Sequence, residues 1–117
     1  GWLEDGEHKE KVFDVACSDG LSVDQDTHRC PENKAWVDLS NCSINADSGE
    51  REMKVLWQDP EFKGNKDAFY YARIIENPVC RWSTWDSIRA GEKPRSDIPV
   101  TIQERAWSSP IWLKKTK

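Results

Sequence analysis

The chain has 117 residues, which suffices for one domain with one hydrophobic core but not for two independent domains. Hydrophobic residues make up 37% and charged residues 32%, so the composition fits a globular domain and is too apolar for a disordered chain. The formal charge of −4 argues against nucleic-acid-binding proteins, and no apolar run approaches the roughly 20 residues of a membrane-spanning helix, so we expect no membrane insertion.

The amino terminus is unusually apolar. Trp2 and Leu3 follow Gly1 without an initiator methionine, whereas natural amino termini are usually polar and loosely held. These residues predict the end of a strand that has been cut from upstream sequence, and a processed mature protein is the alternative. We therefore expect residues 1–117 to form a single domain excised from a larger protein.

Four widely spaced cysteines, Cys17, Cys30, Cys42 and Cys80, include no C-x-x-C pair, which argues against zinc ribbons and thioredoxin-like motifs. Two disulfides are the favoured interpretation, and they would imply a secreted or periplasmic setting. A four-thiolate metal site and four reduced, partly buried cysteines are the alternatives. Of the three connectivities we favour Cys17–Cys30 with Cys42–Cys80, because the first bridge would close the polar excursion 18–29 and stabilise it by ~3 kcal/mol.

Short β-prone segments follow one another along the chain, separated by turn signals. The pattern predicts strands over residues 11–17, 35–44, 52–58, 68–75 and 109–113, while residues 100–106 fit either a strand or a helix. The alternation is clearest in 52–58, where Met53, Val55 and Trp57 would form an apolar face. The segment 68–75 is the most apolar and is the predicted central strand.

One short helix is expected in a long connection. Ser83 precedes an acidic residue by three positions, which is the pattern of a capping box. Gly91 would end the helix and Pro94 would prevent its continuation, so the sequence predicts two helical turns over residues 84–90.

The segment 67–73 resembles the tyrosine corner of immunoglobulin-like domains, in which a Tyr two residues before a Cys binds nearby backbone through its hydroxyl. Tyr70 would be that Tyr, but Ala72 stands where the Cys would be, so the immunoglobulin disulfide cannot form there. The expected fold is therefore mainly β, an Ig-like antiparallel β-sandwich with one short helix in a long connection.

No motif for catalysis or for a cofactor is present, since G-x-S-x-G, P-loop and H-E-x-x-H sequences are all missing. His8 and His28 have no neighbouring ligands and are interpreted as surface histidines. Asp19, Asp24 and Asp26 lack the Gly and Glu of an EF-hand, so a solvated acidic loop is favoured over a calcium site. We expect no catalytic residue, no metal and no cofactor in this chain.

Seven tryptophans are a large number for a chain of this length. Trp36 and Trp57 fit core strands. Trp82 and Trp85, beside Arg81 and Arg89, have the composition of an interface hot spot and suggest docking onto a partner domain. A satellite hydrophobic cluster beneath a loop and a sugar-stacking platform are the alternatives.

Several stretches carry a resemblance to a known family: residues 57–62, 68–86 and 103–112, together with the opening 1–6 and the segment 12–20. The chain resembles, over nearly its whole length, the carboxyl-terminal end of the bacterial proteins known as domain of unknown function 3604. The resemblance implies a much longer and often exported parent. Its amino-terminal part would be similar to metal-dependent phosphoesterases of the polymerase-and-histidinol-phosphatase type.

The His and Asp motifs of that part are absent from this sequence, so the resemblance transfers no catalytic residue. It implies a non-catalytic accessory domain, not an enzyme in itself, that docks on the upstream, hydrolase-like domain of the same polypeptide. A stand-alone module that binds a ligand or carbohydrate is the alternative. The sequence does not indicate the oligomeric state.

Overall fold

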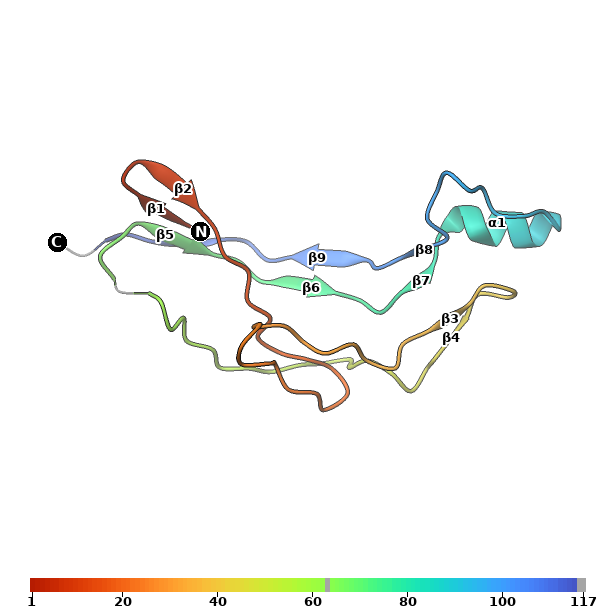
Figure 1. Cartoon of the computed structure of the whole chain (residues 1–117), viewed down its shortest axis with the longest axis horizontal. Helices are drawn as coiled ribbons and strands as arrows, with labels where there is room; N and C mark the ends of the chain where they lie inside the picture. Colours follow the sequence, from red (N-terminus) through yellow and green to blue (C-terminus); the bar gives the residue numbers. More distant parts are fainter. Residues whose placement is uncertain (63, 116–117) are drawn as a thin grey trace.

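The computed structural model describes residues 1–62 and 64–115. The described residues form ten short β-strands and one α-helix, joined largely by irregular segments (Figure 1). In chain order the elements are β1 (Trp2–Glu4), β2 (Glu7–Lys9), β3 (Val37–Asp38), β4 (Ser43–Ile44), β5 (Ala68–Tyr70), β6 (Arg73–Ile75), β7 (Val79–Cys80), α1 (Trp82–Ala90), β8 (Thr101–Ile102), β9 (Arg105–Trp107) and β10 (Ile111–Leu113).

A four-stranded antiparallel sheet, in the order β10-β5-β1-β2, forms one end of the molecule. Asp5 and Gly6 connect β1 to β2 with φ angles of 51° and 83°, as a two-residue hairpin turn of the primed type requires. The predicted strand at Trp2 and Leu3 is confirmed as β1. The predicted central position is confirmed for β5, which pairs with both β1 and β10.

A long antiparallel ladder runs along the greatest dimension of the molecule (Figure 1). Its two sides are residues 68–80, which contain β5, β6 and β7, and residues 101–113, which contain β8, β9 and β10. The ambiguous segment 100–106 therefore contributes strands, and the predicted closing strand within 109–113 is present as β10.

The predicted strand 68–75 is divided in two by an irregularity at Tyr71 and Ala72. There the Ala72 N–H donates to Ser108 Oγ at 2.9 Å, and the Ser108 N–H donates to the Ala72 carbonyl at 2.9 Å. A side-chain hydroxyl thus replaces a backbone acceptor, which interrupts the regular ladder without leaving the Ala72 amide unpaired.

Two of the predicted strands, 11–17 and 52–58, are not strands in the structure. Both segments have one apolar face, but neither forms a ladder with another described segment. The prediction 35–44 is also wrong as a single strand, because it forms the two-stranded ribbon β3–β4. The turn of that ribbon is set by Asp38, whose carboxylate accepts hydrogen bonds from the Ser40 N–H and hydroxyl at 2.8 and 2.7 Å.

The helix α1 begins earlier than predicted, and its N-cap is Arg81 rather than Ser83. Thr84 is 1% exposed, and its hydroxyl donates to the Val100 carbonyl at 2.7 Å, so packing against the β8 side sets the start of the helix. The predicted stop at Gly91 is confirmed, with φ of 68° and the paired backbone hydrogen bonds of a left-handed cap.

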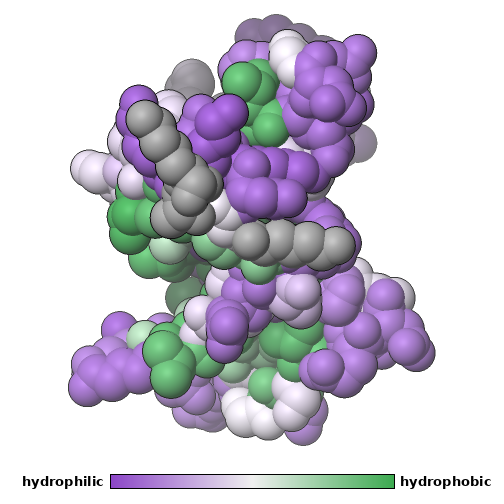
Figure 2. All heavy atoms as spheres, turned by 90° about the vertical axis from the view of Figure 1, so that its left-hand side faces the viewer, coloured by the Kyte–Doolittle hydropathy of each residue, from purple (hydrophilic) through white to green (hydrophobic). Residues whose placement is uncertain are grey.

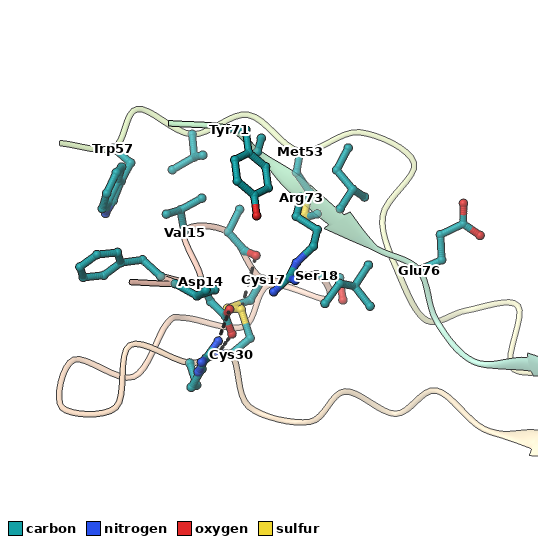
Figure 3. A pocket seen from close by; sticks show the side chains of 18 of the residues that line it. Asp14, Val15, Cys17, Ser18, Cys30, Met53, Trp57, Tyr71, Arg73 and Glu76 are labelled. Carbon is teal, nitrogen blue, oxygen red and sulfur yellow. Dashed lines mark hydrogen bonds and ion pairs between the residues drawn. A yellow bond between two sulfur atoms is a disulfide. The ribbon is translucent and has the colours of Figure 1, made fainter. Parts of the chain in front are cut away.

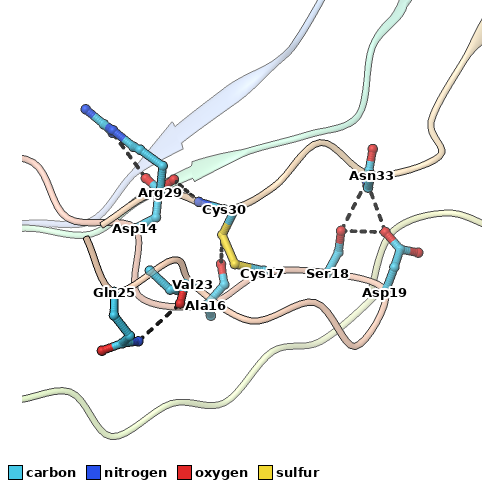
Figure 4. The surroundings of a disulfide bond; sticks show 10 residues. All are labelled: Asp14, Ala16, Cys17, Ser18, Asp19, Val23, Gln25, Arg29, Cys30 and Asn33. Carbon is cyan, nitrogen blue, oxygen red and sulfur yellow. Dashed lines mark hydrogen bonds and ion pairs between the residues drawn. A yellow bond between two sulfur atoms is a disulfide. The ribbon is translucent and has the colours of Figure 1, made fainter. Parts of the chain in front are cut away.

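The fold class is confirmed as mainly β, with several antiparallel sheets and one short helix in a long connection. The immunoglobulin-like sandwich itself stays a prediction. Two disulfides, Cys17–Cys30 and Cys42–Cys80, are present in the favoured pairing. The first closes the polar loop as expected (Figure 4), and the second joins the β3–β4 ribbon to β7.

The molecule is elongated and its core is small. The radius of gyration is 19.0 Å, whereas a compact domain of this length would have about 13 Å. Among the described residues the buried hydrophobic ones are Cys42, Ala68 and Cys80. Trp36 and Trp57, which were expected in the core, are 52% and 37% exposed, so the expectation that the aromatics fill a core is wrong.

Candidate functional site

A hollow of about 2740 Å³ lies between the ladder and the extended segments 10–18 and 50–58, and we call it the central groove. Its lining includes Val15, Met53, Trp57, Tyr71 and Arg73 (Figure 3). Pockets that enclose small molecules usually have volumes of roughly 300–1,000 Å³. The central groove is therefore too large and open for a small-molecule pocket, and its size suits a segment of polypeptide.

An aromatic cluster forms part of the groove wall. The Trp57 ring lies 5.2 Å from Phe13 and 6.4 Å from Tyr70, and Phe62 lies 6.1 Å from Tyr70, all between ring centroids. These contacts join segments that are far apart in sequence. Trp57 thus packs in the wall of the groove instead of the core that the sequence predicted for it, and 37% of its surface stays accessible.

Tyr70 anchors this wall through its hydroxyl, which donates to Asp59 Oδ2 at 2.6 Å. Burial, followed by the hydrogen bond and charge of Asp59, raises the pKa of Tyr70 to about 12. The predicted tyrosine corner is therefore wrong about the hydrogen-bond acceptor of the Tyr70 hydroxyl. The hydroxyl binds a side-chain carboxylate and not nearby backbone, because Asp59 ends the 52–58 segment directly beside β5.

Charged groups lie at the edge of the apolar lining (Figure 3). Asp14 is paired with Arg29 at 3.3 Å and accepts the Cys30 N–H at 2.8 Å, so it belongs to the disulfide-closed loop (Figure 4). Arg73 differs, because its guanidinium makes no hydrogen bond or ion pair within residues 1–62 and 64–115. Its charge is available to whatever occupies the groove.

The acidic loop is organised by hydrogen bonds. Asp19 accepts the Ser18 hydroxyl at 2.7 Å, an Asn33 side-chain N–H at 3.0 Å and the Gly49 N–H at 2.7 Å. The bonds from Ser18 and Gly49 lower the pKa of Asp19. Asn33 also donates to Asn77 at 2.8 Å, so this network joins four segments of the chain.

Asp24 has a similar local role, since it accepts the Asp26 N–H, the Thr27 N–H and the Thr27 hydroxyl. Those bonds, with Thr27 as the main source, lower the pKa of Asp24. Within the described ranges no three His, Cys, Asp or Glu side chains gather as metal ligands. His8 is exposed in β2, and the half-buried His28 lies in a loop with its ring 5.3 Å from the Phe13 ring, so the two histidines lie in different parts of the structure.

The predicted docking residues lie together on α1, at the far end of the molecule from the four-stranded sheet (Figure 1). Trp82 is 73% exposed and Trp85 is 39% exposed, with the Arg89 guanidinium 5.7 Å from the Trp85 ring. The exposure of Trp82 and Trp85 argues against a satellite hydrophobic cluster beneath a loop. Arg81 is half-buried at the start of the helix, where its Nε atom is buried and has no hydrogen-bond partner among the described residues.

Sequence reasoning missed a larger set of exposed apolar side chains outside the helix. They lie on the ladder and on the segment 52–58, and each exposes more than half of its surface. They are Val55, Leu56, Ile74, Trp107, Ile111 and Trp112. Apolar side chains also interrupt the polar surface on the face shown in Figure 2. The apolar content of these segments was visible in the sequence, but it was assigned to an internal core.

The fold and groove can now be compared with known proteins. A family profile described as "Protein of unknown function (DUF3604)" matches residues 1–115. No curated protein and no solved structure matches the chain. Across the described residues no helix is both long and apolar enough to cross a bilayer. The match spans nearly the whole sequence, and the chain therefore belongs to the DUF3604 family.

Proposed function

We propose that this chain is a non-catalytic accessory part of a secreted or periplasmic protein and that it docks on the upstream, hydrolase-like part of the same polypeptide. In this role the chain contributes no reacting group. Its two disulfides support the compartment, because such bonds persist in oxidising environments. The upstream partner is inferred from the family resemblance.

The observation that carries the proposal is the accessible surface of the chain, 9844 Å². A compact monomer of the same mass would expose about 6,500 Å². The excess of about 3,300 Å² is larger than one partner's share of most obligate interfaces, which bury roughly 2,000–5,000 Å² in total over both partners. A chain with this surface is stabilised when a second body covers it.

The chemistry of the surface agrees with a permanent interface rather than a transient one. Exposed tryptophans occur at both ends of the molecule, Trp82 on α1 and Trp112 on β10. Large apolar side chains at this exposure favour burial by about 25 cal/mol for each Å² removed from water. A partner that covers both ends and the central groove would have to extend along most of the 65 Å length of the molecule.

The proposal is tested in the whole polypeptide by inserting a protease site directly before residue 1 and cleaving it. We expect the two pieces to stay associated after cleavage. Replacing both Trp82 and Trp85 with Ala should weaken the association at least 10-fold, because exposed Trp residues beside Arg are typical hot spots. The exposed ion-pair variant Arg95→Ala is the matched control and should not change it.

Dissociation of the cleaved pieces would contradict docking. Turnover of phosphoester substrates by residues 1–117 alone, with divalent metals, would contradict the non-catalytic role. A change of tryptophan fluorescence with a glycan, in a chain that does not bind the upstream piece, would favour the carbohydrate-binding alternative.

A further inference from the structure

Residues 53–57 have the side-chain arrangement of a β-strand. Met53, Val55 and Trp57 line the central groove and Lys54 and Leu56 do not, while Glu52 and Gln58 at the two ends of the segment also line it. Leu56 is fully exposed. Over residues 53–57 successive side chains therefore alternate between the groove and solvent, with the period of two that an extended strand requires.

The backbone of this segment has no partner. Within residues 1–62 and 64–115, no N–H or C=O of residues 52–58 takes part in a hydrogen bond. Water satisfies these groups while the groove is open. Once a partner covers the groove, each backbone group left buried and unpaired would destabilise the complex, so the partner must supply hydrogen bonds.

Another extended backbone is the partner that meets this need. Its donors and acceptors repeat at the same spacing of about 3.3 Å per residue, so that it can pair with several consecutive residues. A helix cannot do this, because its backbone donors and acceptors are already bonded to one another within the helix. The volume of the groove is large enough to hold such a strand, and the excess of exposed surface is large enough for the strand to cover.

We infer that residues 52–58 are an acceptor strand for β-augmentation. A strand from the upstream part of the same polypeptide pairs with their backbone and places alternate apolar side chains in the central groove beside Met53, Val55 and Trp57. The paired part of that strand contains no proline, because proline lacks the N–H that a ladder needs. This inference rests on the proposed function for the identity of its occupant.

Hydrogen–deuterium exchange of the whole polypeptide tests the inference directly. We expect every second amide of residues 53–58 to exchange at least 100-fold more slowly than in residues 1–117 alone. Pairing along one edge would protect every second amide, either 53, 55 and 57 or 54, 56 and 58. Fast exchange of all six in the whole polypeptide would overturn the inference.

Proline substitutions provide a second test, in the cleaved but associated protein. Leu56→Pro removes an N–H from one edge and Val55→Pro removes one from the other, and Leu56→Ala and Val55→Ala are the matched controls. At the protected edge, proline should weaken association at least 10-fold more than alanine does. Equal effects of proline and alanine at both positions would overturn strand pairing.

The outcomes separate this inference from the proposed function. If the cleaved pieces stay together while residues 53–58 exchange rapidly, docking holds and strand addition fails. If the pieces separate, docking itself fails. Concentration-dependent protection of residues 1–117 alone would identify a second copy of this chain as the occupant and would overturn the assignment to the upstream part.

Discussion

At the residue scale, the hydroxyl of Tyr70 joins the ladder to the end of the extended segment 52–58 at Asp59. Its hydrogen bond to Asp59 fixes the end of the segment that carries Trp57, and the ring itself contacts Trp57 and Phe62. The protonated phenol is the form that donates this bond. The interaction therefore depends on pH in the alkaline range.

We predict that Tyr70 titrates with a midpoint near pH 12 in the Tyr71→Phe variant, which contains no other tyrosine. The raised pKa means that folding favours the protonated phenol. The corresponding stability is fully present below pH 10.0, the ordinary value, and is lost as the pH rises through about 12. Phenolate absorbance measured against pH checks the midpoint.

Adding Asp59→Asn should lower the midpoint, since the hydrogen-bonded carboxylate is one cause of the raised pKa. The control Asp97→Asn, which removes an exposed carboxylate paired with Arg95, should leave the midpoint unchanged. A midpoint near 10 with Asp59 intact would contradict both the burial of the Tyr70 hydroxyl and its hydrogen bond to Asp59.

At the element scale, the two disulfides hold segments together that a hydrophobic core would hold together in a compact domain. Cys42–Cys80 connects the β3–β4 ribbon to the ladder over a sequence separation of 38, and its two cysteines are among the few buried hydrophobic residues. Cys17–Cys30 spans only 13 residues and closes a single loop. The longer closure restricts the unfolded chain more.

We predict that removing Cys42–Cys80 with a pair of Ser substitutions lowers the free energy of unfolding by about 4 kcal/mol, against about 3 kcal/mol for Cys17–Cys30. The chain-entropy difference between loops of 38 and 13 residues gives this order. Denaturant unfolding of the two double variants beside the parent chain measures it. A larger loss for the Cys17–Cys30 variant would contradict the prediction.

The elements with local signals could be predicted from the sequence. Gly91 was predicted to end the helix and does so with positive φ, whereas the turn at Asp5 and Gly6 carries a similar local signal that the sequence analysis did not use. Ser83 failed as a cap because the start of α1 depends on Thr84 packing against Val100, a contact between segments 16 residues apart. Tertiary contacts of that kind override a local capping pattern.

The candidate site could be predicted only in part. Trp85 and Arg89 lie four residues apart within the predicted helix 84–90, so their common location followed from the prediction, whereas Trp82 precedes that predicted helix and its place on α1 was not foreseen. The central groove could not be foreseen, because its walls come from segments far apart in the chain. For residues 52–58 the alternation showed an apolar face correctly, but it carried no information about which backbone would pair with it.

At the scale of the whole molecule, an elongated body with little interior depends on ladders and disulfides for its shape. Its dimensions are 65 × 32 × 24 Å. Folded globules of this length have a radius of gyration of about 13 Å and unfolded chains of about 35 Å. The radius of gyration of the structure, 19.0 Å, lies between these two values, so a measured radius of gyration tests the elongated shape directly.

We predict that the oxidised chain, studied alone, has a radius of gyration near 19 Å by small-angle X-ray scattering. The two disulfides and the ladder hold the open shape, so apolar collapse would require breaking paired strands. A value near 13 Å would show that the isolated chain closes its central groove. The same measurement after reduction is the control and should give a larger value.

The four-stranded sheet combines the first strand of the chain, β1, with the last, β10, on either side of β5. During synthesis on the ribosome, β5 has to wait for Leu113 to emerge before its second edge is covered. The bridge between Cys17 and Cys30 joins two thiols of one loop and does not depend on β10, so it can form as soon as the chain reaches an oxidising compartment. The sheet closes last, and a chain that ends before β10 would expose an unprotected edge to aggregation.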